Sequence, residues 1–464
     1  MSTLDEVLKQ INSKFITISN TDRGPYAKHY DFVRDTIILK LKEIDKIFDK
    51  LYRGHCLGGS YADNIKISKP DEYDLVLRLK LRECNLIKVT KDPKLPGYCN
   101  INIKEAMEKI KTEKQNEDIY KHFEKLIDKD GFIIQEKIQR WIESSMTKAL
   151  NELNNGKWII RNGENLYEIK YTKSGPAHTI NVTIDKKFFS VDLVPAFVFD
   201  KTKWIAKRPL PSNTPLKCQD WIAVPKPVKS SVSPNISFIT SYVDTERHLI
   251  KDRCALKSTL KMIKKLRDTR NLHNLKSYFI KTIYLWETER QPENFWDKSI
   301  RIVLLHMMDR LIEYLEKGNI PFFWDRSQNM LGNLDKNQIK SILNEITSAR
   351  KIMETNISKV YDLFLTPDEK KELFKSLSQT EIPILLSDNL KTPGLQSIID
   401  NGNSKIKNQT EADKKVCEIK QILEKYGNNS EKILKEIKKL FSTDIVEISS
   451  LTSGLSKLSL KAKN

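Results

Sequence analysis

The sequence lacks several features that would each point to a class of protein. No apolar run approaches the roughly 18–20 residues that a helix needs to cross a bilayer. The first six residues show no basic segment followed by an apolar stretch, so no secretory signal is expected. The six cysteines lie far apart with no Cys-x-x-Cys pair, which argues against a disulfide framework and a zinc knuckle. We expect a cytoplasmic protein of a reducing compartment.

Positive charge and core-forming residues are abundant instead. The 464 residues include 80 Lys plus Arg against 61 Asp plus Glu, a net charge of +19, and the isoelectric point is near 9.3. This excess favours a polyanionic partner, nucleic acid before a membrane surface, and the alternative is a solvated lysine-rich surface. With 39% apolar residues, the chain has ample material for a packed core.

Aromatic residues indicate where the packed part of the chain lies. All seven Trp fall within residues 141–324, and aromatic side chains are scarce beyond residue 390. The packed body is therefore predicted to stop before an extension over 356–464, which is helical near 411–441 and otherwise loosely ordered.

Apolar periodicity predicts an α/β lobe followed by an all-helical lobe. After an N-terminal segment over 1–26, one long helix is expected over 27–52, where apolar residues recur at three- and four-residue steps. Two strand-like runs follow, and from about residue 246 onward the pattern is helical. The predicted architecture is a lobe over 27–240 and a helical lobe over 241–355, with a central cleft in which ligands usually sit. The strand-like runs are Glu72–Leu79 and Phe188–Pro195, and the main helical runs are 254–267, 279–286 and 300–315.

A glycine-serine turn is the first candidate for chemistry. Gly58 and Gly59 let backbone N–H groups approach an anion closely, and the hydroxyl of Ser60 can donate to a phosphate oxygen. A plain turn is the alternative.

Carboxylates on the two strand-like runs are the second candidate. Side chains alternate along a strand, so Glu72 and Asp74 share a face, and two carboxylates on one face repel each other unless a cation lies between them. Asp192 stands in a run otherwise fit for a buried strand, where an unpartnered carboxylate is costly. The alternatives are a solvent-facing acidic pair and an edge position that reaches water.

Taken together, the turn and the three carboxylates resemble the catalytic set of the polymerase-β-like nucleotidyltransferases. In such a set, carboxylates hold two Mg²⁺ or Mn²⁺ ions about 3.5–4 Å apart. The resemblance implies that Glu72, Asp74 and Asp192 are the metal-binding and catalytic residues. It also implies that Gly59 and Ser60 hold the triphosphate of the donor nucleotide.

Five segments, in order along the chain, resemble the cGAS-like receptors, the animal relatives of cyclic GMP-AMP synthase. The likeness covers about residues 27–355 and is closest to the insect type, which has no zinc ribbon. The segments are Gly58–Ser68 with Glu72–Leu79, Ser241–Glu246, Cys254–Lys257, Ser277–Lys281 and Pro321–Leu331.

The resemblance implies six further nucleotide contacts. The second segment contacts the acceptor nucleotide, the lysine of the third reaches a triphosphate, and the tyrosine of the fourth stacks on a base. If 254–267 is a helix, its lysines form a stripe (Lys257, Lys261 and Lys264) that is free to meet phosphate. The alternatives are a solvated lysine face and an ordinary core tyrosine. The six residues are Ser241, Glu246, Lys257, Ser277, Tyr278 and Lys281.

Two departures from the vertebrate synthase bear on specificity. Ile239 stands where that enzyme has an arginine, and Val243 stands where a second serine is common, so the base preference and the linkage stay open. The zinc ribbon is missing, because its interval holds only His248 and Cys254, and no zinc is expected.

The missing ribbon points to the activating ligand. Ribbon-free insect relatives include double-stranded RNA sensors, and a basic surface can read a duplex through phosphates and 2′-hydroxyls. Each candidate contact has a solvated surface charge as its alternative. The candidates are Lys28, Arg34, Lys40, Lys42, Lys251, Arg267 and Arg270.

The resemblance therefore implies a cyclic dinucleotide synthase activated by nucleic acid, most simply by double-stranded RNA. Its substrates would be ATP and GTP. Its product, cyclic GMP-AMP or a related molecule, would act on STING as a second messenger of antiviral innate immunity, with no membrane partner. The alternatives are an enzyme that adds nucleotides to an RNA 3′ end and a catalytically silent nucleic-acid-binding scaffold.

Overall fold

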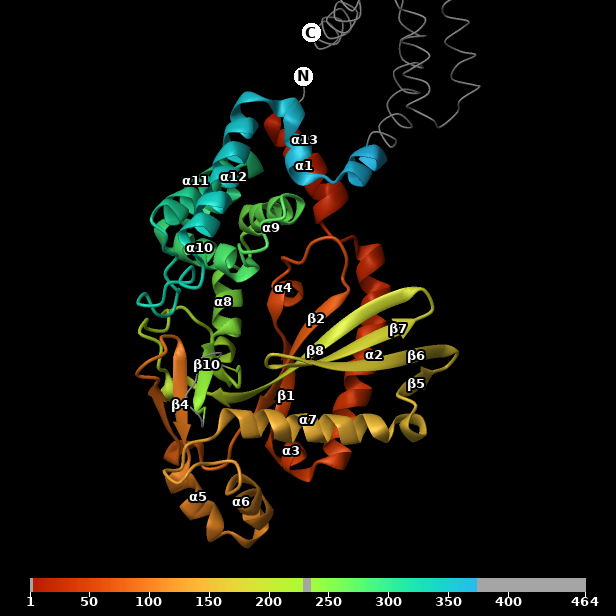
Figure 1. Cartoon of the computed structure of the whole chain (residues 1–464), viewed down its shortest axis with the longest axis vertical. Helices are drawn as coiled ribbons and strands as arrows, with labels where there is room; N and C mark the ends of the chain where they lie inside the picture. The colour runs from red at the N-terminus through yellow and green to blue at the C-terminus, as the bar shows by residue number, and fades with distance from the viewer. Residues whose placement is uncertain (1–2, 228–234, 374–464) are drawn as a thin grey trace, which may run out of the picture. The chain divides into compact units, whose positions relative to one another are not determined.

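A mixed sheet forms the α/β part of the chain, built from runs rich in the β-branched and aromatic residues that suit a pleated surface. The computed structural model describes residues 3–227 and 235–373, and ten strands within these ranges form the sheet (Figure 1). Their order is β3-β4-β10-β9-β8-β7-β6-β5, and β2 pairs with β8 and carries β1 on its other side. The strands are β1 Tyr52–Leu57, β2 Glu72–Leu79, β3 Lys88–Lys91, β4 Tyr98–Asn102, β5 Ile159–Asn162, β6 Asn165–Ser174, β7 Ala177–Ile184, β8 Lys187–Phe199, β9 Trp221–Val224 and β10 Ser237–Ser241.

The central pair of this sheet confirms the two predicted strands. β2 has the predicted bounds, and β8 contains the predicted run and continues beyond it. The two strands run parallel, whereas the other pairs of described strands are antiparallel. Buried apolar residues of β2, β8 and β9 pack together beneath them.

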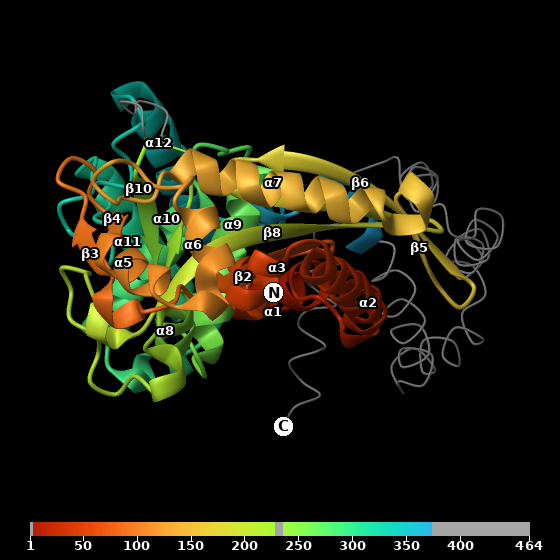
Figure 2. The same cartoon turned by 90° about the horizontal axis from the view of Figure 1, so that it is seen from below.

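Helices flank the sheet, and one of them corrects a prediction. α7 packs against α2 and lies along the sheet (Figure 2). The single helix expected over 27–52 is two helices, α2 and α3, because Asp45 is extended (φ −122°, ψ 98°) and accepts hydrogen bonds from the N–H groups of Ile47 and Phe48. Trp141 and Ser145 also donate to the same carboxylate, which fixes the break. The flanking helices are α2 Asn20–Ile44, α3 Lys46–Leu51, α5 Lys104–Lys111, α6 Glu117–Phe123 and α7 Gln135–Asn151, and α4 Gly59–Ala62 lies beside β2.

The helical lobe follows in the predicted order. Leu256, Leu260 and Ile263 are buried on α9, which packs against α10 and α11, while α11 also packs against α12. The predicted architecture, an α/β lobe followed by an all-helical lobe, is therefore confirmed. No described helix has both the length and the apolar character needed to span a bilayer. The helices are α8 Val243–Leu249, α9 Cys254–Thr269, α10 Ser277–Arg290, α11 Ile300–Glu316, α12 Lys336–Thr355 and α13 Val360–Phe364.

Helices near the two limits of the Leu4–Phe364 unit add to the helical lobe. α1 (Leu4–Ile11) packs against α11 and α13, and the π-helical turn Asn12–Ile16 packs against α9. One compact unit comprises Leu4–Phe364, and Thr3 and residues 365–373 fall outside it. The helix expected near 411–441 lies outside the described residues.

Candidate active site

The parallel pairing of β2 with β8 brings two of the predicted carboxylates together. Asp74 lies directly opposite Asp192, and Glu72 lies opposite Ser190. Neighbouring strands are about 4.8 Å apart, so the two aspartates, 118 positions apart in the chain, are adjacent on the sheet. Both side chains are half-buried, whereas Glu72 is exposed at the beginning of β2.

The electrostatics of these aspartates are those of a crowded acidic site. Burial, and then the charges of Glu72 and Asp192, raise the pKa of Asp74 to about 6. Burial also raises the pKa of Asp192, although the hydroxyl of Thr179 on β7 donates to its Oδ1 atom at 2.6 Å and opposes the shift. The charge of Asp192 thus disfavours the charge of Asp74, the charge of Glu72 disfavours both, and a bound cation would relieve this repulsion.

Glu72 has a different partner. Its Oε2 atom lies 2.6 Å from Nζ of Lys66, which also lies 3.6 Å from Asp71. Within the described ranges, no group of three or more His, Cys, Asp or Glu side chains is arranged to hold a metal ion. The structure therefore brings Asp74 and Asp192 together and leaves Glu72 beside them in an ion pair.

The predicted glycine-serine turn lies against Asp74. The N–H of Gly58 donates to the Asp74 carbonyl at 2.7 Å, so the turn continues directly from the sheet. Gly59 has φ +60°, and a Cβ placed on it would lie 1.6 Å from Oδ2 of Asp74, so a side chain there would collide with the carboxylate. Ser60 follows, half-exposed, in the short helix α4. A strand carboxylate and a close backbone turn are thus adjacent.

Comparison with known proteins identifies the family. The Mab-21 protein nucleotidyltransferase domain matches residues 61–252, and the Mab-21 protein HhH/H2TH-like domain matches residues 255–348. A cyclic GMP-AMP synthase-like receptor of Lucilia cuprina is 34% identical over 355 residues, which are 76% of this chain and 93% of that protein. The chain belongs to the cyclic GMP-AMP synthase-like receptor family.

Further relatives agree. Cyclic GMP-AMP synthase-like receptor 1 of Drosophila melanogaster is 31% identical over 345 residues, covering 74% of this chain and 89% of that protein. A cyclic GMP-AMP synthase-like receptor of Tribolium castaneum is 30% identical over 378 residues, covering 79% and 93%. The chain is therefore a nucleotidyltransferase with a C-terminal helical domain, and the resemblance found in the sequence is confirmed.

Three of the predicted nucleotide contacts form one cluster, in which Glu246 and Lys281 are buried and Tyr278 is half-buried. Glu246 accepts hydrogen bonds from the Tyr278 hydroxyl at 2.6 Å and from the Trp324 indole N–H at 2.9 Å. Its other oxygen pairs with Lys281 at 2.9 Å, and Lys281 also pairs with Asp63 at 2.7 Å. Burial, and then the charge of Glu246, raise the pKa of Tyr278. These side chains hold one another in place behind the turn.

The remaining nucleotide candidates are more open. Ser241, at the end of β10, Lys257, on the first turn of α9, and Ser277, at the beginning of α10, are all half-exposed. A guanidinium N–H of Arg267 donates to the Ser277 hydroxyl, so Arg267, expected on the nucleic-acid surface, points toward α10.

The lysine stripe of α9 is largely not available to phosphate, contrary to expectation. Lys261 is buried and donates to the Thr17 hydroxyl at 3.0 Å, and Lys264 is buried and donates to the Ile65 carbonyl at 2.8 Å. Burial, and then the charge of Arg267, lower the pKa of Lys264 to about 8. The N-terminal segment and the loop after α4 cover this face, which no local periodicity predicts.

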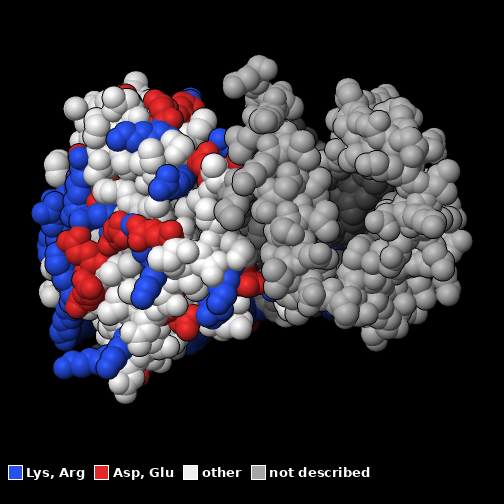
Figure 3. Space-filling model, turned by 90° about the horizontal axis from the view of Figure 1, so that it is seen from above, with Lys and Arg blue, Asp and Glu red and all other residues white. Residues whose placement is uncertain are grey.

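Most predicted nucleic-acid contacts are ion-paired. Lys28 is exposed, and no described residue forms an ion pair with it. On the face seen in Figure 3, acidic side chains gather among the basic ones. Pairs in which both side chains are exposed, such as Lys42 with Asp49, are weak, so a polyanion can displace them. The pairs are Arg34 with Asp31 and Asp35, Lys40 with Glu43, Lys42 with Asp49, Lys251 with Asp252, Arg267 with Asp268, and Arg270 with Glu345.

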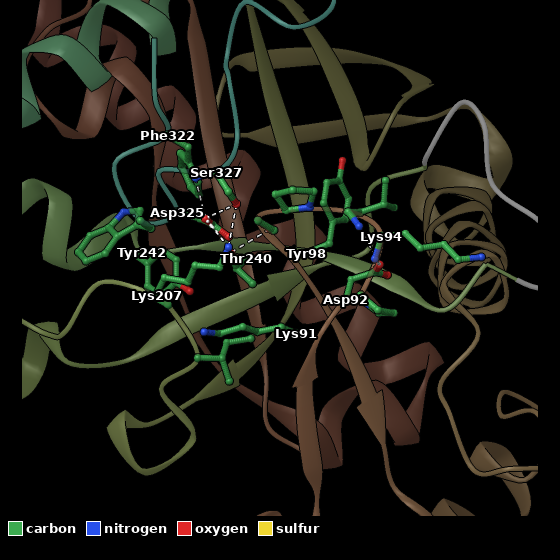
Figure 4. Close-up of a pocket in the computed structure, with 17 residues that line it drawn as sticks. Lys91, Asp92, Lys94, Tyr98, Lys207, Thr240, Tyr242, Phe322, Asp325 and Ser327 are labelled. Carbon is green, nitrogen blue, oxygen red and sulfur yellow. Dashed lines mark hydrogen bonds and ion pairs between the residues drawn. The ribbon is translucent and has the colours of Figure 1, made fainter. Parts of the chain in front are cut away.

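A separate cavity of about 260 Å³ opens beside the loop between β3 and β4 (Figure 4). Lys207 reaches into it and pairs with Asp325 at 3.0 Å, while the hydroxyl of Ser327 donates to the same carboxylate. Tyr98 and Tyr242 form part of its wall, and none of the predicted carboxylates lines it.

Sequence reasoning missed three residues around the turn. Each of them forms an ion pair with a residue of another element or loop. The pairs are Asp63 with Lys281, Lys66 with Glu72, and Arg247 with Asp63. Asp63 and Lys66 lie inside the segment that resembles the family, and Arg247 directly follows another. Their charge was visible, but no spacing rule predicts that they meet.

Proposed function

We propose that this chain is a nucleic-acid-activated synthase that joins ATP and GTP into cyclic GMP-AMP or a related cyclic dinucleotide. The observation that carries the proposal is the register of β2 and β8, with Asp74 across from Asp192 and against Gly59. The names of the relatives, cyclic GMP-AMP synthase-like receptors, support the product class.

Asp74, Asp192 and Glu72 are the residues proposed to hold two Mg²⁺ or Mn²⁺ ions. The raised pKa values of Asp74 and Asp192 support this role, because burial and then neighbouring carboxylates disfavour their charge, and a shared cation would offset both effects. Glu72 would join them if its ion pair with Lys66 were released. When bound, the ions would neutralise charge on the triphosphate and acidify the acceptor hydroxyl.

The chain's own residues bind and orient the nucleotides. Gly59 and Ser60 would hold the donor triphosphate, because the turn offers backbone N–H groups and a hydroxyl next to Asp74. Tyr278 would stack on a purine base. The other proposed contacts are Ser241, Glu246, Lys257, Ser277 and Lys281.

The reaction needs positioning more than covalent chemistry. A ribose hydroxyl of the acceptor attacks the α-phosphorus of the donor in line, an O–P bond forms, and the bond to pyrophosphate breaks. Thr179 holds Oδ1 of Asp192, and Oδ2 is the atom proposed to take the hydroxyl proton. The linear intermediate then turns over, and its free ribose hydroxyl attacks the α-phosphorus of the remaining triphosphate, so the second O–P bond forms and a second pyrophosphate leaves.

Double-stranded RNA is the proposed activator, and the product is proposed to act on STING in the cytoplasm. The net charge of +19 supports a polyanionic ligand. The candidate contacts are those of the sequence analysis, led by Lys28, which is exposed.

Product analysis tests the proposal. Purified protein is incubated with ATP, GTP and Mg²⁺ or Mn²⁺, with and without duplex RNA or duplex DNA, and products are identified by mass and linkage-specific nucleases. We expect a small cyclic dinucleotide that depends on duplex RNA, and none from Asp192→Asn. Lengthened RNA would identify a 3′-end nucleotidyltransferase, and no product under any condition would identify a silent scaffold.

A further inference from the structure

Three basic side chains from three different helices hold the segment that contains the glycine-serine turn. The segment runs from Leu57 to Ile65, between β1 and the loop before β2. Arg247 reaches it from α8, Lys264 from α9 and Lys281 from α10. We call these three residues the turn clamp.

Arg247 contacts both sides of the turn. Its Nη2 atom donates to the Leu57 carbonyl at 2.5 Å, directly before Gly58, and its Nε atom donates to Oδ1 of Asp63 at 3.2 Å. Asp244, one helical turn earlier on α8, accepts from its Nη1 atom at 3.2 Å. One guanidinium thus joins the beginning and the end of the turn.

Lys281 holds the end of the turn from inside the protein. Its Nζ atom lies 2.7 Å from Oδ2 of Asp63 and 2.9 Å from Oε2 of Glu246, and both carboxylate side chains are only 4% exposed. Burial alone would lower the pKa of Lys281, but Glu246 and Asp63 raise it above its usual range. The ammonium therefore stays charged between two buried carboxylates.

Asp63 is where two members of the clamp meet. Each of its carboxylate oxygens has a different cation, Arg247 on Oδ1 and Lys281 on Oδ2. Its own N–H donates to the Gly59 carbonyl at 3.3 Å, and the Ile65 N–H donates to the Ser60 carbonyl at 2.8 Å. A displacement of Asp63 is thereby transmitted to the backbone of Gly59 and Ser60.

We propose that Asp63 is a positioning residue: its paired contacts with Arg247 and Lys281 fix the turn at the position in which it receives the donor triphosphate. The effect of Asp63 on catalysis rests on the proposed function. Its effect on the position of the turn is independent of that function. Asp63 lies behind the turn, 4% exposed, and acts through the backbone of Gly59 and Ser60. It also holds the buried ammonium of Lys281 in place.

Hydrogen exchange tests the positioning without any reaction. Asp63→Asn keeps the size of the side chain but removes the charge, and we expect at least tenfold faster amide exchange in the peptide covering residues 57–66. Glu287→Gln is the matched control, because Glu287 is also buried on α10 and pairs with Arg290, His306 and Arg310, away from the turn. The control should leave exchange in residues 57–66 unchanged, and Asp63→Glu should restore protection at least in part. Equal exchange in wild-type protein and Asp63→Asn would overturn the proposal.

Kinetics separate positioning from a general loss of folded protein. If the turn is displaced, the KM for ATP should rise at least fivefold in Asp63→Asn while kcat changes less than threefold. A merely structural role would lower the apparent kcat at unchanged KM, as expected for Glu287→Gln, and that result would contradict the proposal.

A second variant keeps the test decisive if Asp63→Asn does not fold. Arg247→Gln leaves the Asp63–Lys281 pair in place and releases the Leu57 carbonyl, so a smaller increase in exchange over residues 57–66 is expected. No increase would overturn the proposal. If wild-type protein makes no dinucleotide, the proposed function fails, while the exchange measurement still decides the role of Asp63.

Discussion

Gly59 lies so close to Asp74 that a Cβ on the glycine would be 1.6 Å from the Oδ2 atom of the aspartate. The backbone of Gly59 also has φ +60°, a conformation that costs other residues roughly 1–3 kcal/mol. Gly58, next to it, has φ −104°, and a Cβ there would meet its nearest neighbour at 3.7 Å. A side chain is therefore excluded at position 59 by both space and backbone conformation, whereas position 58 can accept one.

We expect Gly59→Ala to lower the free energy of unfolding by about 1–3 kcal/mol and to abolish synthesis, because Asp74 must move away from the methyl group. Gly58→Ala is the control and should retain most of both properties. Thermal unfolding and product formation measure the two effects. Equal activities of the two variants would contradict a close approach between the turn and Asp74.

Removing either central carboxylate should stop the reaction without unfolding the protein. Asp74→Asn and Asp192→Asn are nearly isosteric, and each removes a charge from a pair that is mutually unfavourable. We expect no product and no measurable binding of Mn²⁺ by electron paramagnetic resonance. Synthesis at the wild-type level by either variant would refute the assignment of these aspartates as metal ligands.

The raised pKa of Asp74 predicts a pH-dependent stability when metal is chelated. Its pKa is about 6 in the folded protein and near 3.8 when unperturbed, so the folded state binds the proton more tightly. The resulting stabilisation is fully present below about pH 4 and is lost as the pH rises through 6. Two pKa units correspond to about 3 kcal/mol.

Urea unfolding with a chelator, at pH 4 to 7.5, measures this effect. The difference in stability between Asp74→Asn and wild-type protein should shift in favour of the variant as the pH rises. A difference that is independent of pH would show that Asp74 titrates normally.

Tyr278 allows stacking to be separated from hydrogen bonding. Its hydroxyl donates to Glu246 at 2.6 Å, while its ring supplies the surface proposed to stack on a purine. Tyr278→Ala should raise the KM for a purine triphosphate, since such stacking contributes about 1–3 kcal/mol per base. Tyr278→Phe keeps the ring and should change KM much less. An unchanged KM in Tyr278→Ala would assign the ring to the core alone.

The predicted RNA contacts differ in whether they are already ion-paired, and this difference predicts how much each contributes to RNA affinity. Lys28 has no ion pair with a described residue, whereas Arg34 pairs with Asp31 and Asp35, so binding RNA through Arg34 first requires that its pairs break. Lys28→Ala should weaken duplex RNA binding more than Arg34→Ala. It should also reduce the slope of log K against log salt by about 0.7–0.9. Equal affinities of wild-type protein and Lys28→Ala would remove Lys28 from the interface.

Local patterns predicted the elements that carry the site. The bounds of β2 follow from a continuous run of strand-forming residues, and α9 to α11 follow from helical periodicity. The family likeness indicated that three carboxylates belong together. Which of them are opposite is a matter of register between β2 and β8, and nothing within either strand specifies it.

Contacts between residues far apart in the sequence could not be predicted from local sequence patterns. The helix break at Asp45 depends on Trp141 and Ser145, about a hundred positions away, and helical periodicity alone runs through it. Likewise, Asp63 and Lys281 are 218 positions apart, and their meeting follows from how α4 and α10 are placed by the rest of the fold. Charge alone gave no sign that either residue is buried.

The first helix has a practical consequence for work with shortened versions of the protein. Leu4, Val7, Leu8 and Ile11 are buried, and α1 packs on α11 and α13 although the family likeness begins only near residue 27. A version trimmed to that likeness would lose both α1 and α13 and would expose the apolar faces of α11 and α9 against which they pack, a surface of the kind that promotes aggregation. Samples for crystallisation or activity assays should therefore keep the first sixteen residues. An N-terminal affinity tag should be added in front of these residues and should not replace them.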